Sequence, residues 1–208
     1  MNILAIETSQ AQASVCLCCN GNIVASHHWE AERNHDSHLF PALQHLLQQL
    51  GDAPLDIILV GAGPGSYGGV RVALAAAVGI ATVKCAKTVA ICSWLGLVNA
   101  DTAIISDARR GGWTLMQPNG SIDVLTTDEL KQRLNNGLQA ASIESKETLA
   151  QNGIVLGTCG LIPSASGITR AWLNMDEEQQ KNLLQTPPEP IYVRPPHITA
   201  AKRKPWEC

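Results

Sequence analysis

The chain has 208 residues, of which 45% are hydrophobic and only 4% aromatic, and its formal net charge is −3. This length suits one domain or two small ones, and the core must be mainly aliphatic. The slight negative charge argues against a protein that binds nucleic acid on its own, because such proteins usually carry a basic face. The one basic cluster, Lys202, Arg203 and Lys204, lies near the end of the chain, where a solvated segment is the simpler interpretation.

The seven cysteines indicate reduced thiols rather than a disulfide framework. Their number is odd, and no Cys-x-x-Cys pair is present. No secretory signal is recognisable at the start, because Asn2 and Glu7 interrupt the first apolar run. We therefore expect a cytoplasmic protein. Cys16 and Cys18 share one face of a predicted strand, but no further ligand is spaced to complete a metal site with them.

The first fifty residues predict three strands and then a helix. The predicted strands are residues 2–7, 13–19 and 23–30. Asn20–Gly21, between the last two strands, is a hairpin signal, because a type I′ turn needs positive φ at both positions. A stripe of leucines predicts a helix over residues 35–50, with Asn34 or Ser37 as its N-cap.

Residues 61–84, GAGPGSYGGVRVALAAAVGIATVK, organise the rest of the chain. Five glycines fall within nine residues and follow a short apolar run, which predicts the order strand (residues 56–60), glycine loop and helix. The helix is expected to begin near Val70. From Val72 to Val83 its one polar residue is Thr82, so it is apolar nearly all round, whereas a helix that covers a core is usually apolar on one side.

Two interpretations of this apolar helix stay open. It is either the buried central helix of its own domain, or a helix with one face covered by another protein. Small residues four apart, such as Ala75 and Gly79, would allow close approach of a second helix. A membrane span is not expected, because the apolar run is far shorter than the ~20 residues required and is flanked by Arg71 and Lys84.

The second half predicts a smaller set of the same elements. Residues 88–92 form a strand, and Ser93 caps a short helix to about residue 99. Further strands are expected at residues 102–106, 113–117, 122–125 and 154–156, and helices at 127–134, with Thr127 as cap, 168–174 and 177–184. An extended, proline-rich tail follows Pro187. The order β-β-β-α-β-α-β-α in the first half is that of a ribonuclease-H-like unit of the actin-like group, and we expect a boundary near residues 99–102.

No catalytic or cofactor motif is convincing. Gly63-x-Gly65-x-x-Gly68 matches a dinucleotide fingerprint by letter, but three strands precede it and no acid follows about 20 residues on. We therefore expect no cofactor. His35 and His38 lie three apart, yet nothing is spaced to complete a metal site, so exposed histidines at a helix start are the simpler interpretation and no metal is predicted.

Polar residues at two predicted strand ends are candidates for a nucleotide site. Glu7, Thr8 and Ser9 lie where an actin-like fold keeps its first phosphate loop, although a plain polar turn that closes the hairpin is the simpler interpretation. Asp107 and Arg109 lie in a turn at another strand end, where functional groups are frequent. A structural Asp–Arg turn explains them equally well.

Several segments together resemble the TsaB (YeaZ) family, the partner proteins in bacterial synthesis of threonylcarbamoyladenosine on tRNA. The segments are ILAIETS (3–9), HDSHLFPALQHLL (35–47), GAGPGSYGGVRVALAAAVGIA (61–81), SDARRG (106–111) and PIYVR (190–194). The resemblance is strong over residues 1–110 and weaker beyond. It implies an α/β, actin-like (ASKHA) fold of two ribonuclease-H-like lobes, the second reduced. Residues 1–100 would form the first lobe and 101–208 the second lobe with its tail.

The resemblance also implies a function and partners. The chain would be a non-catalytic scaffold that dimerises with a TsaD-like transferase, with a TsaE-like ATPase as third member and tRNA contacted mainly through the complex. Apart from the resemblance, an exposed apolar patch is often paired with itself when its partner is missing, so we expect a homodimer, or a weak one, in isolation. The implied interface lies on the first-lobe helices, at His38, Leu39, Ala42, Gly69, Val70, Ala73, Ala76, Ala77 and Ile80. A vestigial nucleotide site would comprise Glu7, Thr8, Ser9 and Asp107.

The sequence departs from the family pattern at two places, and two other functions remain alternatives. Glu7 replaces the family's usual Asp, and Tyr67–Gly68 replaces Phe-Thr, which weakens a nucleotide role. One alternative is an ATP-dependent phosphotransferase of the actin-like superfamily that acts alone through Glu7, Thr8 and Asp107. A metallopeptidase is the second alternative, without a credible zinc site.

Overall fold

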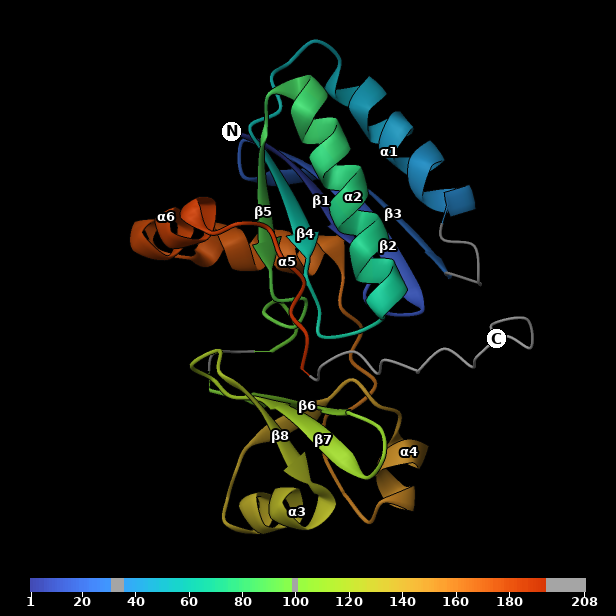
Figure 1. Cartoon of the computed structure of the whole chain (residues 1–208), viewed down its shortest axis with the longest axis vertical. Coiled ribbons are helices and arrows are strands. Elements are labelled where there is room, and N and C mark those ends of the chain that lie inside the picture. Colours follow the sequence, from blue (N-terminus) through green and yellow to red (C-terminus); the bar gives the residue numbers. More distant parts are fainter. Residues whose placement is uncertain (31–35, 99–100, 194–208) are drawn as a thin grey trace, which may run out of the picture.

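The structure, a computed structural model, describes residues 1–30, 36–98 and 101–193, which form two lobes stacked along the long axis (Figure 1). The strands of the upper lobe are β1 (Asn2–Glu7), β2 (Gln12–Cys19), β3 (Asn22–Glu30), β4 (Ile57–Gly61) and β5 (Lys87–Ile91). They form one sheet in the order β3-β2-β1-β4-β5. β1 pairs antiparallel with β2 and parallel with β4, so the chain returns through a helical crossover before β4.

The hairpin between β2 and β3 follows from its two turn residues. Asn20 has φ 51° and Gly21 has φ 81°, which confirms the predicted turn with positive φ at both positions. Both strands pair along nearly their whole length, from Gln12 opposite Glu30 to Cys19 opposite Asn22.

Two helices, α1 (Asp36–Leu50) and α2 (Tyr67–Lys84), cover one face of the first sheet. Leu4 and Ile6 of β1 point to this face and pack with Leu39 of α1 and Val70 of α2. Alternate residues of the same strand, Ile3 and Ala5, point to the other face. This period-two alternation places a separate apolar core on each side of the sheet.

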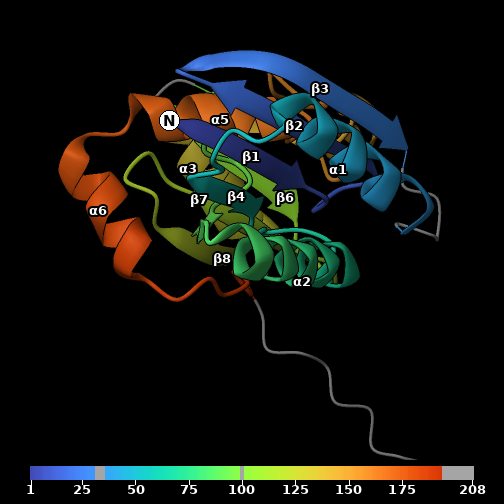
Figure 2. The same cartoon turned by 90° about the horizontal axis from the view of Figure 1, so that it is seen from above.

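The opposite face is covered by the end of the chain. Helix α5 (Ala165–Asn174) packs there on β1, β2 and β4 through Ile168 and Trp172, and α6 (Glu177–Gln185) contacts β5 (Figure 2). Two hydrogen bonds fix α5, from Ala165 N to Ser14 Oγ at 2.8 Å and between Cys16 Sγ and Thr169 Oγ1 at 3.2 Å. The prediction that residues 101–208 all accompany the second lobe therefore differs from the structure.

The lower lobe repeats the first in reduced form. Its elements are β6 (Ala103–Asp107), β7 (Gly112–Met116), β8 (Ile122–Thr126), β9 (Ala140–Ser142), α3 (Thr127–Asn135) and α4 (Lys146–Gln151). The sheet order is β8-β7-β6-β9, with β6 antiparallel to β7 and parallel to β9. This is the pattern of β3-β2-β1-β4, and within the described residues no fifth strand corresponds to β5.

Several local predictions were wrong, each for a physical reason. Ser93 does not cap a helix, because its Oγ accepts a hydrogen bond from Gly63 N at 3.0 Å and the chain forms a turn there. Thr126, one residue before the predicted cap Thr127, is the N-cap of α3 and forms a capping box with Glu129. Residues 154–156 form no strand, and the short β9 and α4 lie in a stretch without clear periodicity.

The helix after the glycine loop begins three residues earlier than predicted, at Tyr67. Ser66 is its N-cap and accepts a hydrogen bond from Gly69 N. Ser37 lies inside α1 and is not its cap, and the other candidate, Asn34, lies outside the described residues.

Within the described part of the chain, α2 is the single helix long and apolar enough to be a candidate membrane span, with a mean hydropathy of 1.2. Six of its residues are buried on the lobe's own sheet side. Its composition alone is weak grounds for a membrane.

Candidate functional site

The glycine loop packs directly on the segment that follows β1. A side chain at Gly65 would collide with the backbone carbonyl of Ser9, and one at Gly69 with the carbonyl of Thr8. The amide of Ser66 donates to Ser9 O at 2.6 Å, between these two contacts. The loop is therefore glycine-rich because two backbone segments touch, and no phosphate is needed to explain it.

Two of the four predicted nucleotide-site residues have side chains that are both buried and hydrogen-bonded at this loop. Glu7 is fully buried, and its Oε1 accepts a hydrogen bond from Ser9 N at 2.7 Å. Burial raises the pKa of the Glu7 carboxyl above its ordinary value of 4.5, although the hydrogen bond from the Ser9 amide acts in the opposite direction. The hydroxyl of Thr8 donates to Gly69 O at 2.8 Å. Both side chains thus stabilise the loop.

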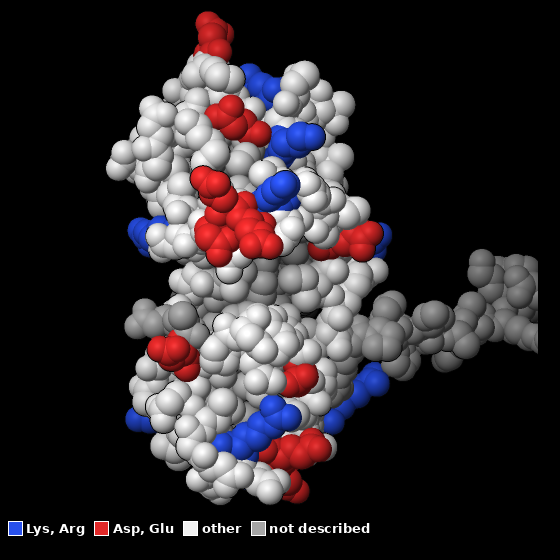
Figure 3. Space-filling view, turned by 90° about the vertical axis from the view of Figure 1, so that its left-hand side faces the viewer, with Lys and Arg blue, Asp and Glu red and all other residues white. Residues whose placement is uncertain are grey.

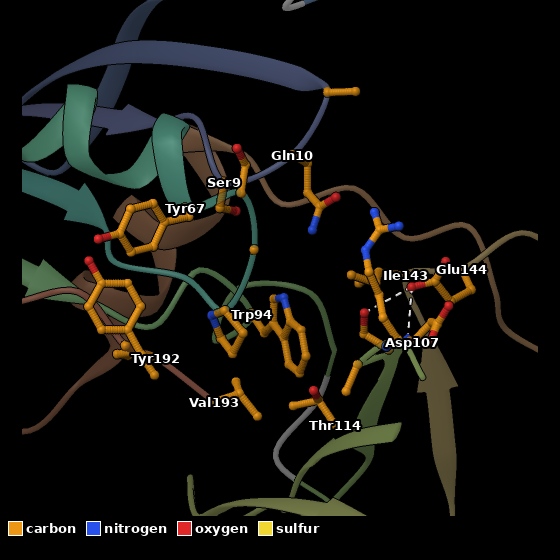
Figure 4. Close-up of a pocket in the computed structure, with 18 residues that line it drawn as sticks. Ser9, Gln10, Tyr67, Trp94, Asp107, Thr114, Ile143, Glu144, Tyr192 and Val193 are labelled. Atoms are coloured by element: carbon orange, nitrogen blue, oxygen red, sulfur yellow. Dashed lines mark hydrogen bonds between the residues drawn. The ribbon is translucent and has the colours of Figure 1, made fainter. Parts of the chain in front are cut away.

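A cavity of about 580 Å³ lies between the two lobes (Figure 4). The remaining two predicted residues, Ser9 and Asp107, both line it and come from different lobes. Trp94, from the turn after β5, and Glu144, which follows β9, line the same cavity. Figure 4 shows Ser9 and the two carboxylates on opposite sides, with Trp94 between them.

One side of the cavity contains hydrogen-bonding groups without partners. Ser9 and Trp94 are each 1% exposed, and neither Ser9 Oγ nor Trp94 Nε1 has a hydrogen-bond partner. Ser66 and Tyr67, at the N-terminus of α2, border this side as well. Trp94 could not be singled out from the sequence, because five tryptophans are scattered through the chain without a motif.

The other side of the cavity carries carboxylates on the second lobe. Glu144 Oε1 accepts hydrogen bonds from Ser106 Oγ at 2.8 Å and from Asp107 N at 3.0 Å. Asp107 Oδ1 in turn accepts from Arg109 N at 2.6 Å. Arg109 and Arg110 hold positive φ values of 62° and 55°, a conformation that non-glycine residues adopt at some cost. The predicted turn at Asp107 is thus a tightly fixed edge of the cavity.

The tail begins as an ordered strap across the first lobe. Ile191 N donates to Ala62 O at 2.8 Å, and Tyr192 stacks on Tyr67 with ring centroids 5.2 Å apart. Arg71 donates to the Tyr67 hydroxyl at 3.0 Å. The extended tail predicted after Pro187 therefore docks on the start of α2, as far as residue 193.

The nine predicted partner-interface residues divide into two groups. Six lie inside the first lobe's own core: Leu39, Gly69, Val70, Ala73, Ala76 and Ala77. His38 is exposed, and Ala42 and Ile80 are half-buried. α2 is therefore buried on one side and open on the other, so the first interpretation, a helix buried in its own domain, holds for one face only.

The open sides of α1 and α2 form a surface without charged residues, which we call the α1/α2 surface. All residues of this surface are half-buried or exposed. They are Phe40, Gln44, Leu47, Gln48, Ala75, Val78, Gly79, Ile80 and Val83. Phe40 is 53% exposed and Val83 80%. A shallow groove between the two helices is lined by Phe40, Leu47 and Ile80, and by Asp52 just beyond the end of α1. No Lys, Arg, Asp or Glu occurs in residues 37–50 or 72–83.

Gly79, in the middle of α2, is not required by the packing of this chain. A Cβ built at Gly79 would meet nothing within 4 Å. Glycine in a helix interior costs about 1 kcal/mol relative to alanine. A gap at this position on an exposed, uncharged helix face allows another helix to approach the backbone closely.

Acidic side chains gather on a different side of the first lobe. Figure 3 shows them on the side covered by α6, whose first turn is preceded by Asp176 and contains Glu177 and Glu178. Asp176 caps this helix, so the carboxylates also complement its dipole. This side of the lobe is not a basic surface of the kind that binds nucleic acid.

No metal site emerges from the described residues. Within residues 1–30, 36–98 and 101–193, no group of three or more His, Cys, Asp and Glu could hold a metal ion. His38 is exposed at the start of α1, and its proposed companion His35 lies outside the described residues. Cys16 and Cys18 are buried free thiols.

Two ribonuclease-H-like lobes, the second reduced, with a cavity between them define this chain as an α/β protein of the actin-like class. Solved structures agree. A Pseudomonas aeruginosa protein described as similar to the peptidase YeaZ has a TM-score of 0.68 and 24% identity, and covers 93% of this chain and 99% of its own. YeaZ from the same organism has a TM-score of 0.65 and 22% identity, with coverages of 92% and 99%.

Sequence comparisons give the family. The tRNA N6-adenosine threonylcarbamoyltransferase (TsaD) family model matches residues 23–150. Bacillus subtilis TsaB, a tRNA threonylcarbamoyladenosine biosynthesis protein, is 26% identical over 190 residues, covering 88% of this chain and 69% of that protein. Escherichia coli TsaB is 38% identical over 84 residues, covering 39% and 36%. The chain belongs to the TsaD family, and both of these curated relatives are TsaB proteins.

Proposed function

We propose that this chain takes part in threonylcarbamoyladenosine modification of tRNA as a non-catalytic subunit that pairs with a TsaD-like transferase. Its similarity to two TsaB proteins supports the pathway, since both are named for threonylcarbamoyladenosine biosynthesis. The observation that carries the pairing is the α1/α2 surface. Two adjacent helices expose apolar side chains there, and no charged residue interrupts them.

The composition of the α1/α2 surface suits a protein partner. The centres of protein interfaces are depleted in charged residues and enriched in aromatic and aliphatic anchors. Phe40, Ile80 and Val83 can serve as such anchors, and Gly79 leaves room for a partner helix. The proposed interface therefore consists of the outward-facing residues of α1 and α2, including the predicted positions His38, Ala42 and Ile80. The six buried positions of the predicted interface pack against the first sheet and hold the two helices in place.

The polar loop after β1 supports an accessory rather than a catalytic role. Of the three residues on which a phosphotransferase would depend, only Asp107 lines the cavity, while Glu7 and Thr8 are buried in loop packing. A nucleotide phosphate would meet neither of the buried side chains. The vestigial nucleotide site predicted from the sequence is thus reduced to Ser9 and Asp107.

We further propose that tRNA is contacted mainly through the complex, in the cytoplasm, with a TsaE-like ATPase as third member. The net charge of −3 and the acidic side chains at α6 make tight binding of tRNA by the lone chain unfavourable.

To test this proposal, the gene for the chain is replaced in the cell by genes for variants. The amount of threonylcarbamoyladenosine in total tRNA is then measured by nucleoside mass spectrometry. The chain with Gly79→Arg should fail to restore the modified nucleoside, because the long side chain obstructs the α1/α2 surface. Gly157→Arg is the matched control, since Gly157 is also exposed, has room for a side chain and lies in the second lobe. Full restoration by Gly79→Arg would refute the proposed interface, and normal modification in cells without the chain would refute the proposed pathway.

A further inference from the structure

The interlobe cavity has polar groups of opposite kind on its two sides, and we propose that it binds a small zwitterion of the α-amino-acid type. The ligand's carboxylate would accept hydrogen bonds from Ser9 and Trp94, and its ammonium group would lie between Asp107 and Glu144. This site is separate from the α1/α2 surface, so the inference does not depend on the proposed pairing.

The donor side is assigned from two buried groups that the fold leaves unsatisfied. Trp94 Nε1 and Ser9 Oγ are buried, line the cavity and have no partner. Leaving a buried donor unpaired is costly, and native structures seldom do so without an ordered water or another bound group. In Figure 4 the indole nitrogen of Trp94 faces the space beside Ser9 and Gln10.

The N-terminus of α2 adds to the donor side. Ser66 and Tyr67 border the cavity at the start of an 18-residue helix. The first turn of a helix carries free amides and a partial positive charge, which favours a carboxylate. An indole N–H, a hydroxyl and this helix start all suit an anionic, hydrogen-bond-accepting group.

The acceptor side carries a net negative charge. Asp107 and Glu144 contribute two carboxylates, and Arg109, which also lines the cavity, contributes one guanidinium. Glu144 is held in place through Oε1 by Ser106 Oγ and Asp107 N. A fixed carboxylate on a partly buried wall is a binding group for an ammonium, because charge-assisted hydrogen bonds are strong there.

The same charges disfavour a polyphosphate ligand. A nucleoside triphosphate would place several negative charges against two carboxylates and one guanidinium. No group of three metal ligands lies among the described residues to offset them. A volume of about 580 Å³ lies within the range of small-molecule sites and leaves room for an amino acid's side chain.

The test uses the purified full chain and the signals of its indole N–H groups in ¹⁵N–¹H spectra. Each of the twenty L-amino acids, ADP and sodium phosphate is titrated separately up to about ten millimolar, with Trp94→Phe used to assign the Trp94 signal. We expect at least one amino acid to shift that signal saturably. The signal of Trp172 should not move, because its Nε1 is also buried and unpartnered but does not line the cavity.

Variants test the two ends of the ligand. Ser9→Ala should weaken binding about tenfold, and so should Glu144→Gln, which keeps the acceptor for Ser106 but removes the charge. Trp172→Phe is the control and should leave the affinity unchanged. Sodium acetate carries only the carboxylate and methylamine only the ammonium group, so each should bind at least tenfold more weakly than the amino acid.

Three outcomes would overturn the inference. The first is a Trp94 shift produced by ADP or phosphate and by no amino acid, which would indicate an anion or nucleotide site. The second is the absence of any shift with all twenty amino acids. Unchanged affinity in Glu144→Gln is the third, since the second-lobe carboxylate would then play no part.

Discussion

The carboxyl group of Glu7 lies directly against the α-carbon of Gly61, where no side chain would fit. These two residues end the neighbouring parallel strands β1 and β4, which pair up to Ile6 and Val60. The glycine loop after β4 therefore encloses Glu7, the polar residue at the end of β1, so that this carboxyl does not face a ligand.

Gly61→Ala should destabilise the protein by about 2 kcal/mol, because the added methyl group must displace the buried Glu7 carboxyl. Gly79→Ala is the matched control. Its Cβ meets open space on a helix, so this change should stabilise the protein by up to about 1 kcal/mol. Urea unfolding of both variants measures the two effects. Equal stability of Gly61→Ala and the wild type would show that the contact imposes no constraint.

The raised pKa of Glu7 gives stability a defined dependence on pH. The folded state holds this proton more tightly than the unfolded state, whose carboxyl titrates near 4.5. The stabilisation is complete below pH 4.5 and is lost as the pH rises through the folded-state pKa, by at most about 1.4 kcal/mol per pH unit.

Glu7→Gln should remove this dependence, because the amide does not titrate. The unfolding free energy of the wild type minus that of the variant should therefore fall as the pH is raised above 4.5. Urea titrations between pH 4 and 8 measure this difference, in which the contributions of other groups cancel. A difference that stays constant, or rises with pH, would contradict a raised pKa.

The stacked rings of Tyr67 and Tyr192 should couple the tail to α2. A double-mutant cycle with Tyr67→Ala and Tyr192→Ala isolates this pair from the contact between Tyr67 and Arg71. Stacked aromatic pairs contribute about 0.5–1.5 kcal/mol beyond simple burial, and the coupling energy from thermal or urea unfolding should lie in that range. A coupling near zero would mean that the strap is held by its backbone alone, through Ile191 N and Ala62 O.

The free chain should self-associate through the α1/α2 surface when no partner is present, because an exposed apolar patch is often covered by a second copy. Sedimentation velocity at increasing concentration should show a monomer–dimer equilibrium for the wild type and a monomer for Gly79→Arg. A wild-type monomer at high micromolar concentration would exclude this association.

The first lobe was predictable because its signals are local. The hairpin at Asn20–Gly21, the leucine stripe of α1 and the alternation of β1 each depend on near neighbours. The helix α2 was recognised, but its buried side could not be assigned from residues that are apolar all round. As a result, Ala76, an obvious candidate for a partner contact, proved to be 9% exposed and part of the core.

The second half was harder to predict because its placement depends on long-range contacts. α5 and α6 follow the second sheet in sequence, yet Ile168 and Trp172 fit the uncovered face of the first sheet. The short β9 is recognisable only by its pairing with β6. Of the candidate site, Ser9 and Asp107 were found from their positions at strand ends, whereas Trp94 and Glu144 carry no motif and meet them only in the folded chain.

The proposed pairing with a TsaD-like transferase takes place through the outward-facing residues of α1 and α2. The most direct test is isothermal titration calorimetry of the purified chain with the TsaD-like protein of the same cell, using the wild type, Gly79→Arg and Gly157→Arg after circular dichroism has shown all three to be folded. We predict saturable binding for the wild type and Gly157→Arg, and a loss of at least a hundredfold in affinity for Gly79→Arg. Equal binding by Gly79→Arg, or no binding by the wild type, would contradict the claim.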